Sequence, residues 1–201
     1  MLKLNLGCGA IHKKGFVNID KFATMERIKR ELKLGNKAIR IEKGAKFLEA
    51  DIRKLPYKDG EVDYIESIDV IEHFGFYEVY DLLKEVKRVL KPGGIAKFMT
   101  LDFDALAREW IEVAETKPVN IDNYFPLSKA IYGNQIDEGN FHKSAWTPAI
   151  AYQIFKADIG FSNIEVFIYP KGCNTKPDMQ TALWKKTWSL LHTSMLIKAT
   201  K

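Results

Sequence analysis

Two glycines near the start of the chain stand one residue apart, in the segment Leu-Asn-Leu-Gly-Cys-Gly at residues 4–9. Glycine lets a backbone turn sharply and approach a ligand closely, because it carries no side chain. The apolar residues at 2–6 predict a strand, and the glycines follow its carboxyl end. A two-glycine turn is also a common way for a strand to end, so other residues must support a ligand-binding interpretation.

Two aspartates follow the next predicted strands. Residues 16–19 form the second predicted strand, which Asp20 closes, and residues 46–49 form the third, which Asp51 follows. Ligands on open parallel sheets lie outside the carboxyl ends of the strands. There Asp20 can accept hydrogen bonds from ribose hydroxyls, and Asp51 can accept one from an adenine amino group. Either acid alone favours a simple cap, but the ordered set of glycines and acids indicates a nucleoside site.

Candidate proton acceptors form a second group. His142, in the segment Gly-Asn-Phe-His-Lys at 139–143, is the leading candidate for a general base, with a hydrogen-bonding loop histidine as the alternative. Asp69 follows the fourth predicted strand and could act as a base or bind a cofactor. His73 stands after it, beside Glu72, where a structural role is favoured over catalysis. His12 and His192 have no assigned role.

The elements that must position these residues alternate between short strands and amphipathic helices. Further strands are predicted at residues 62–67, 95–101, 164–169 and 194–200, the last two paired antiparallel. Apolar residues at spacings of three and four over 79–90 predict a helix, which Pro92-Gly93-Gly94 ends. Residues 146–159 predict another. This alternation predicts an α/β protein with a mostly parallel sheet.

The chain shows no repeat, low-complexity tract or linker, so residues 1–201 are expected to form one domain. Residues 102–145 are rich in aromatic residues and prolines, with only partial helical periodicity. Long irregular connections in compact domains are usually lids or binding loops. We therefore expect this inserted region to bind the acceptor.

Composition excludes several classes of protein. Hydrophobic residues make up 46% and charged residues 28% of the chain, which is ordinary for a globular domain. No apolar run has the roughly 20 residues that a membrane helix needs, and the first residues resemble a strand more than a secretory leader. The two cysteines, Cys8 and Cys173, form no disulfide framework and no metal-ligand pattern. We expect a cytoplasmic protein with no metal.

Positive charge gathers in one part of the sequence. Residues 13–46 hold eleven Lys or Arg residues against four acids, a net charge of +7, whereas the whole chain carries +5. Such a stretch can attract phosphates, although a solvated helix and loop is the simpler interpretation.

Five segments in order resemble one family, the class I S-adenosylmethionine-dependent methyltransferases. They are Leu-Asn-Leu-Gly-Cys-Gly at 4–9, Gly-Phe-Val-Asn-Ile-Asp at 15–20, Ala-Asp-Ile at 50–52 with Leu-Pro at 55–56, Asp-Tyr-Ile-Glu-Ser-Ile-Asp-Val-Ile-Glu-His at 63–73, and Arg-Val-Leu-Lys-Pro-Gly-Gly at 88–94. The chain is especially similar to small predicted methyltransferases of type 11, often associated with surface-sugar gene clusters. Two departures stand out: Asn5 replaces a common acid, and a third glycine is missing.

The resemblance implies a Rossmann-like, doubly wound sheet of seven strands in the order 3-2-1-4-5-7-6, with the last strand antiparallel. It also implies S-adenosylmethionine as cofactor and S-adenosylhomocysteine as product. The residues that it assigns to the cofactor are Leu6, Gly7, Cys8, Gly9, Asp20, Asp51, Ile52, Ser67 and Asp69.

The expected activity is methyl transfer to a small molecule or sugar, at oxygen, with His142, Asp69 and His73 as candidate catalytic residues. The sugar rests on the resemblance alone. One alternative is RNA methylation using residues 13–46, but no Asn- or Asp-Pro-Pro-aromatic segment follows the fourth strand. Another is a non-catalytic protein that binds the cofactor. The oligomeric state is not predicted.

Overall fold

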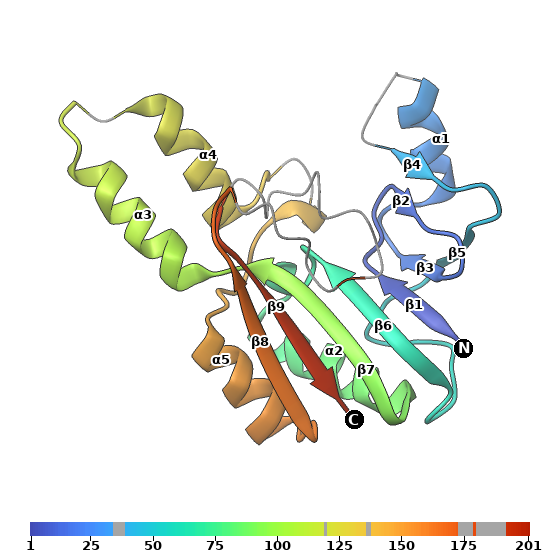
Figure 1. The fold of residues 1–201 in the computed structure, drawn as a ribbon. Helices are drawn as coiled ribbons and strands as arrows, with labels where there is room; N and C mark the ends of the chain where they lie inside the picture. Colours follow the sequence, from blue (N-terminus) through green and yellow to red (C-terminus); the bar gives the residue numbers. More distant parts are fainter. Residues whose placement is uncertain (34–38, 119, 136–137, 173–178, 180–191) are drawn as a thin grey trace.

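Seven strands form one twisted sheet in the order β5-β3-β1-β6-β7-β9-β8 (Figure 1). The computed structural model describes residues 1–33, 39–118, 120–135, 138–172, 179 and 192–201. The strands are β1 (Lys3–Leu6), β3 (Val17–Asp20), β5 (Lys46–Glu49), β6 (Val62–Ile68), β7 (Leu90–Leu101), β8 (Asn163–Tyr169) and β9 (Ser194–Thr200). β9 runs antiparallel to both β7 and β8, whereas the pairs among the first five strands are parallel.

The expected fold class is confirmed, and the strand list differs in detail. Two short strands, β2 (Ile11–His12) and β4 (Arg40–Ile41), pair with each other in a second small sheet that the sequence did not predict. Two residues each are too short to show a period. When only the strands of the large sheet are counted, its order is the expected 3-2-1-4-5-7-6.

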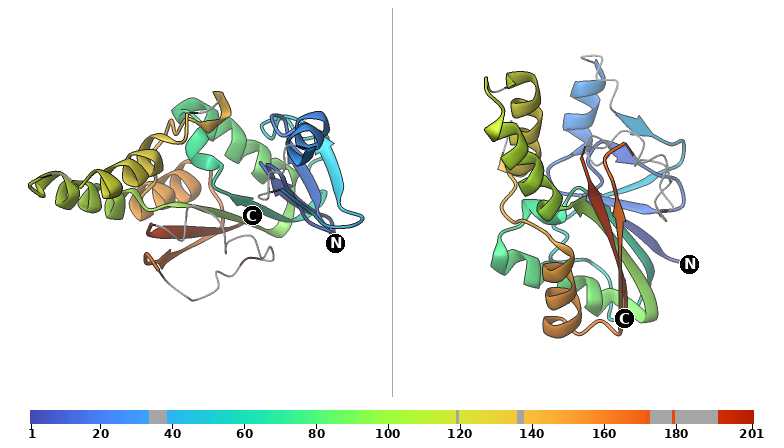
Figure 2. Two further views of the ribbon diagram at one scale, coloured as in Figure 1. Left: turned by 90° about the horizontal axis from the view of Figure 1, so that it is seen from above. Right: turned by 60° about the vertical axis from the view of Figure 1, so that its left-hand side comes forward.

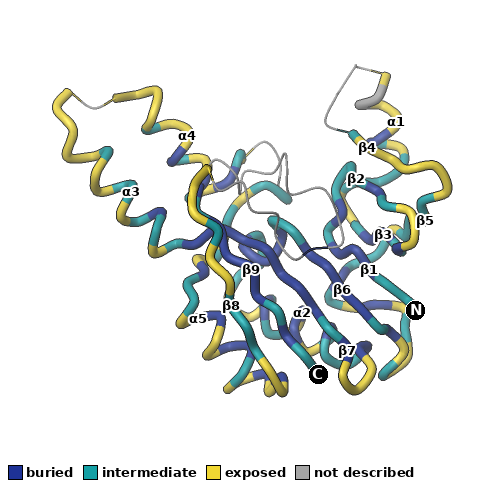
Figure 3. The backbone as a smooth tube through the Cα atoms, in the orientation of Figure 1, coloured by how far each residue is buried: buried dark blue, intermediate teal, exposed yellow. Residues whose placement is uncertain are grey.

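Two helical segments cover one face of the sheet (Figure 2). α2 (Phe76–Val89) buries the predicted apolar stripe, including Leu82, Leu83 and Val86. α5 (Pro148–Tyr152) continues into a π-helical turn, Gln153–Asp158. These two elements stand where the sequence predicted a single helix at 146–159. Their side chains join those of the central strands in the main core, and Figure 3 shows these strands as the most buried part of the backbone.

The region from 102 to 145 is more regular than expected. It contains α3 (Phe103–Glu115) and α4 (Ile121–Tyr132), which pack on each other and project from the end of β7 (Figure 1). Asp102 and Asn120 cap them by accepting hydrogen bonds from the second backbone N–H of each helix. The prediction of an irregular stretch was wrong, and one source of the error is Pro126, which lies inside α4 although proline usually ends a helix.

Short helical elements complete the edge of the sheet where the strands end. α1 (Met25–Lys33) follows β3, a 3₁₀ turn (Ile71–His73) follows β6, and another (Glu138–Asn140) follows α4. In the described part of the chain, no helix has the length and apolarity needed to cross a membrane.

Candidate functional site

A cavity of about 500 Å³ opens at the carboxyl ends of β1, β3, β5 and β6. We call it the first cavity. The predicted site residues that line it are Gly7, Gly9, Asp20, Asp51, Ile52, Asp69 and His73. The sequence analysis thus placed most of its cofactor residues around one hollow, as parallel-sheet geometry requires.

The glycine turn forms one wall of the first cavity. Gly7 has φ +63°, and a Cβ there would lie 2.4 Å from a methyl carbon of Val70. Gly9 has φ +52° but faces open space, with no heavy atom within 4 Å of such a Cβ. Both positions therefore require a left-handed backbone, and Gly9 leaves the hollow clear.

Three predicted cofactor residues do not line the first cavity. Leu6, Cys8 and Ser67 are buried, and the Ser67 hydroxyl donates to the Leu6 carbonyl oxygen at 3.2 Å. Burial raises the pKa of the Cys8 thiol, so it is no nucleophile. At the end of a strand, some side chains face the cavity and others face the core. The sequence alone does not say which side each of them faces.

Asp20 organises the turn around the first cavity. One carboxylate oxygen accepts from the backbone N–H of Gly9 at 2.9 Å, and the other accepts from Phe22 and Ala23 at 2.7 and 2.8 Å. A carboxylate has about four acceptor positions. Asp20 is therefore both a turn cap and a cavity-lining acid with acceptor capacity left.

Asp51 is held by two cations. Arg53 donates to it from its backbone N–H, Nε and Nη2, and Lys21 donates from Nζ at 3.1 Å. Side-chain hydrogen bonding to Arg53 holds the pKa of Asp51 well below its usual range. These four donors fill the acceptor positions of the carboxylate, so adenine would have to displace the Lys21 contact.

A second cavity of about 280 Å³ lies beside the first, between the end of β7 and the α3–α4 pair. Its wall is mostly apolar and aromatic, with Phe103, Tyr132 and Trp146 among the residues that line it. Its titratable residues are Glu72, Tyr132, His142 and Lys143, and Lys143 also lines the first cavity.

Two buried carboxyl groups stand between the cavities: Asp69 lines the first, and Glu72 lines the second. Within the described residues, Oδ1 of Asp69 and both oxygens of Glu72 have no hydrogen-bond partner. Burial raises the pKa of Asp69, helped by the Glu72 charge, and burial raises the pKa of Glu72 to about 7. Thr100 lies close enough to favour the ionised form of Glu72, although no hydrogen bond of ordinary geometry joins them. Asp69 also has φ +51°, an uncommon conformation that often marks functional positions.

Two histidines complete the junction. The rings of His73 and His142 meet edge to face with centroids 4.7 Å apart. Nδ1 of His73 lies 3.0 Å from the Phe141 carbonyl oxygen, and Nδ1 of His142 lies 2.9 Å from that of Ala130. Burial, and secondly His73, lowers the pKa of His142 to about 4, which makes it a neutral and weakly basic imidazole.

Backbone hydrogen bonds join the two segments that carry these histidines. The carbonyl oxygen of Glu72 accepts from the N–H groups of Lys143 and Ser144, at 2.8 and 3.2 Å. Gly133 makes the approach of the later segment possible, because a Cβ there would lie 1.9 Å from the Asn140 carbonyl oxygen. About 70 residues of chain separate the two segments.

Comparison with known proteins supports a methyltransferase. Residues 4–98, slightly less than half of the chain, match the family model described as a methyltransferase domain. Together with the structural neighbours below, this match supports a class I S-adenosylmethionine-dependent methyltransferase. No curated protein matches the sequence.

Solved structures share the fold of this methyltransferase. An S-adenosylmethionine-dependent methyltransferase from Archaeoglobus fulgidus is 12% identical, with a TM-score of 0.59 over 99% of this chain and 85% of its own. One from Thermotoga maritima, described as a possible histamine N-methyltransferase, is 17% identical with a TM-score of 0.57 over 100% and 82%. One from Methanosarcina mazei is 18% identical with a TM-score of 0.56 over 99% and 91%. At these identities the likeness establishes the fold alone.

S-adenosylmethionine is the cofactor of the family, and the first cavity of this methyltransferase fits it. The volume suits a ligand of this size, and the open side of Gly9 leaves room at the end of β1. Asp20 would hold the ribose with its remaining acceptor capacity, and Ile52 would lie against the adenine. The role of Asp51 toward the adenine stays a prediction, because its carboxylate is already engaged.

Several residues of the cavities were missed by sequence reasoning. They are Phe22, Arg27, Arg53, Phe74, Glu78 and Lys143 in the first cavity, and Thr100, Phe103 and Trp146 in the second. Arg53 had a signal, since it stands two residues after Asp51 and can reach back to it. The others come from separate helices and loops, and nothing local in the sequence relates them.

The unassigned histidines lie away from the junction. His12 contacts the Gly9 carbonyl oxygen at 3.2 Å and stacks on Phe47. Nδ1 of His192 lies 3.1 Å from a carboxylate oxygen of Glu109. Both are structural, and Cys173 lies outside the described residues.

Proposed function

We propose that this methyltransferase transfers the methyl group of S-adenosylmethionine to a hydroxyl oxygen of a small acceptor. The observation that carries the proposal is a pair of neighbouring cavities that share Lys143, with the buried carboxyl of Asp69 in the wall of the first and that of Glu72 in the wall of the second. The first cavity suits the cofactor, and the smaller one, walled by apolar and aromatic residues, suits a small molecule or a sugar ring. We propose residues 102–145 as the acceptor-binding part of one domain, in a cytoplasmic protein.

In the proposed reaction, the methyl carbon leaves the sulfonium sulfur and bonds to the acceptor oxygen. The electrons of the broken carbon–sulfur bond stay on sulfur, which becomes a neutral thioether. The hydroxyl proton passes to the carboxylate of Asp69, whose Oδ1 is buried at the junction without a hydrogen-bond partner among the described residues. The protein otherwise supplies alignment and a dry site.

His142 is a weaker candidate for the proton than the sequence suggested. A carbonyl oxygen only accepts, so Nδ1 of His142 must donate its hydrogen to Ala130. Only Nε2 is then left to accept a proton, and burial, which lowers the pKa of His142 to about 4, disfavours that proton. A different role for it is argued below.

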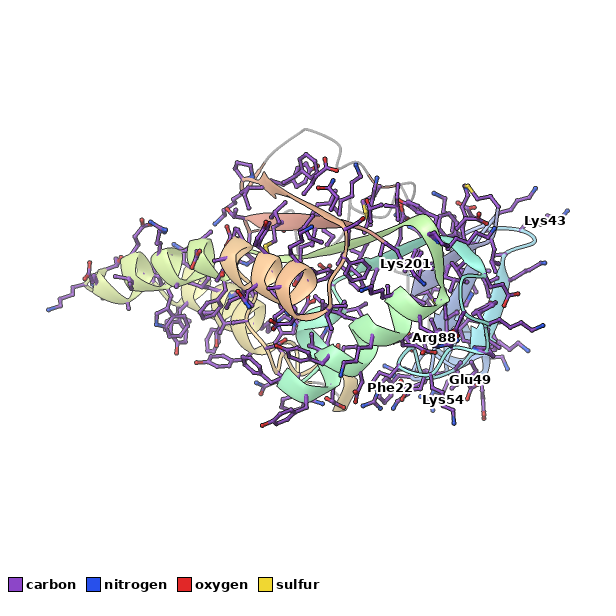
Figure 4. The ribbon with its side chains drawn as sticks, turned by 90° about the horizontal axis from the view of Figure 1, so that it is seen from below. Phe22, Lys43, Glu49, Lys54, Arg88 and Lys201 are labelled. Atoms are coloured by element: carbon purple, nitrogen blue, oxygen red, sulfur yellow. The ribbon has the colours of Figure 1, made fainter. Side chains whose placement is uncertain are left out.

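The basic stretch at 13–46 lies far from the second cavity. Its strands and helix sit at the opposite end of the sheet from the α3–α4 pair (Figure 1). Figure 4 shows Lys43 reaching outward at that end, where it is exposed. An RNA drawn to this surface would not thereby enter the second cavity, which supports a small acceptor over RNA.

The test is a methylation assay with the purified protein, S-adenosylmethionine and panels of hydroxylated, amine and RNA acceptors. We expect S-adenosylhomocysteine to form with a hydroxylated small molecule. Asp69→Asn should then lower turnover by about 10²–10⁴-fold, the usual contribution of a general base, and calorimetry should show that this loss exceeds any loss of cofactor affinity. Turnover only with amines or RNA would show that the acceptor is an amine or an RNA and not a hydroxylated small molecule. Tight product binding without turnover on any panel would favour a non-catalytic binder.

A further inference from the structure

We infer that Glu72, His73 and His142 form a binding site for one divalent transition-metal ion at the junction of the two cavities. One ligand atom from each residue lies within 4.8 Å of the other two. Proteins bind such ions with two imidazoles and one carboxylate, which leave further coordination positions on the metal open. The three residues come from two segments that backbone hydrogen bonds to Glu72 hold together.

The burial of Glu72 points independently to a missing partner. The residue is 4% exposed, and neither carboxylate oxygen has a hydrogen-bond partner within the described residues. An unpaired buried carboxylate is costly, and such groups are normally paired or coordinate a metal. A cation between Glu72 and the two rings would satisfy it. The nearby Lys143 ammonium lies toward Glu78 instead, at 4.0 Å.

The orientation of the two rings suits ligation. Both Nδ1 atoms lie at hydrogen-bond distance from backbone carbonyl oxygens, Phe141 for His73 and Ala130 for His142. This contact places the hydrogen on Nδ1 and the lone pair on Nε2. Metal-ligating histidines commonly donate their other ring N–H in this way, which fixes the tautomer and the ring.

The donor set selects among ions. Imidazole favours Zn²⁺ and its neighbours over Mg²⁺ and Ca²⁺, which prefer oxygen ligands. Bonds of about 2.0–2.2 Å to nitrogen and oxygen would draw the three ligand atoms closer than they now lie. Binding would therefore require the three side chains to move toward the ion.

The consequence for catalysis rests on the proposed function. Glu72 and His142 line the second cavity and His73 lines the first, so an ion held by them would stand where the acceptor oxygen meets the methyl group. A bound metal lowers the pKa of a coordinated hydroxyl and orients it. The proton would still pass to Asp69.

The test uses the full chain without a histidine tag, dialysed against a chelator and titrated with Zn²⁺ by calorimetry. We expect one ion per chain. Glu72→Gln and His142→Ala should each weaken Zn²⁺ binding by more than the roughly 10–100-fold that outer-shell changes cost. His192→Gln is the matched control, because His192 is another buried histidine beside a carboxylate, and it should bind Zn²⁺ like the wild type. Circular dichroism confirms that each variant is folded.

Absence of Zn²⁺ binding, or equal binding by the wild type and the folded Glu72→Gln variant, would overturn the site. Cofactor affinity is measured on the same metal-free protein, so the two proposals fail separately. If the metal-free protein binds S-adenosylmethionine and methylates an acceptor at the full rate, the inferred role of the ion is wrong and the proposed function stands. If the cofactor does not bind with or without Zn²⁺, the proposed function fails while the metal site is judged by calorimetry alone.

Discussion

Asp20 and Asp51 in the first cavity are surrounded by hydrogen-bond donors, whereas Oδ1 of Asp69 and both oxygens of Glu72 have none within the described residues. The first pair stabilises the fold around a hollow that is already shaped. The second pair is buried at a cost that the protein fold alone does not offset. The comparison indicates that the first cavity is preorganised by protein contacts, whereas the buried carboxyl groups of the second pair are left for a ligand to satisfy. Four changes can break or sharpen this comparison.

The largest effect is expected from Gly133→Ala. Its Cβ would lie 1.9 Å from the Asn140 carbonyl oxygen, so the segment that carries His142 must shift. A misplacement of about 1 Å can cost about 10²-fold in rate, and we expect a loss of this size with unchanged cofactor affinity. The control is Gly44→Ala, which shares a positive φ but faces open space. Equal losses in the two variants would mean that strain, and not the position of His142, lowers the rate.

Asp20→Ala should weaken the cofactor side. It removes the acceptor of three backbone N–H groups and the expected ribose ligand. We expect S-adenosylmethionine affinity to fall by about 1–3 kcal/mol, the range for hydrogen bonds to charged groups, and the free energy of unfolding to fall as well. Calorimetry and denaturant unfolding measure the two. Unchanged affinity would refute the ribose role.

Glu72→Met should raise the stability of the protein, whereas Asp20→Ala should lower it. It replaces an unpartnered buried carboxylate with an apolar side chain of similar length, which relieves a penalty of about 1–3 kcal/mol. In metal-free protein at neutral pH, the free energy of unfolding should therefore rise. A fall would show that Glu72 is satisfied in the folded protein and that the contrast with Asp20 does not hold.

The smallest effect concerns pH. Arg53 depresses the pKa of Asp51 in the folded protein, so this pair contributes stability that is present above the unfolded value of about 4 and lost as pH falls below it. Asp51→Asn lacks this contribution. Its thermal midpoint should therefore change less than that of the wild type between neutral pH and about pH 3. Parallel curves would show that the Arg53 contact is too exposed to matter.

The sequence by itself determined the sheet and most of the first cavity. The strand ends that carry Gly7, Gly9, Asp20 and Asp51 are local patterns, and parallel strands bring their carboxyl ends to one edge whatever the details of packing. The cofactor side could thus be predicted from short segments read in order.

Only the tertiary structure decided which residues meet around the second cavity. The two helices within 102–145 pack on each other, and Pro126 inside α4 made this stretch look irregular in the sequence. Glu72 and His142 come together through a glycine turn and backbone hydrogen bonds to a segment about 70 residues away. Spacing along the chain carries no information about such contacts, because they depend on how separate elements dock.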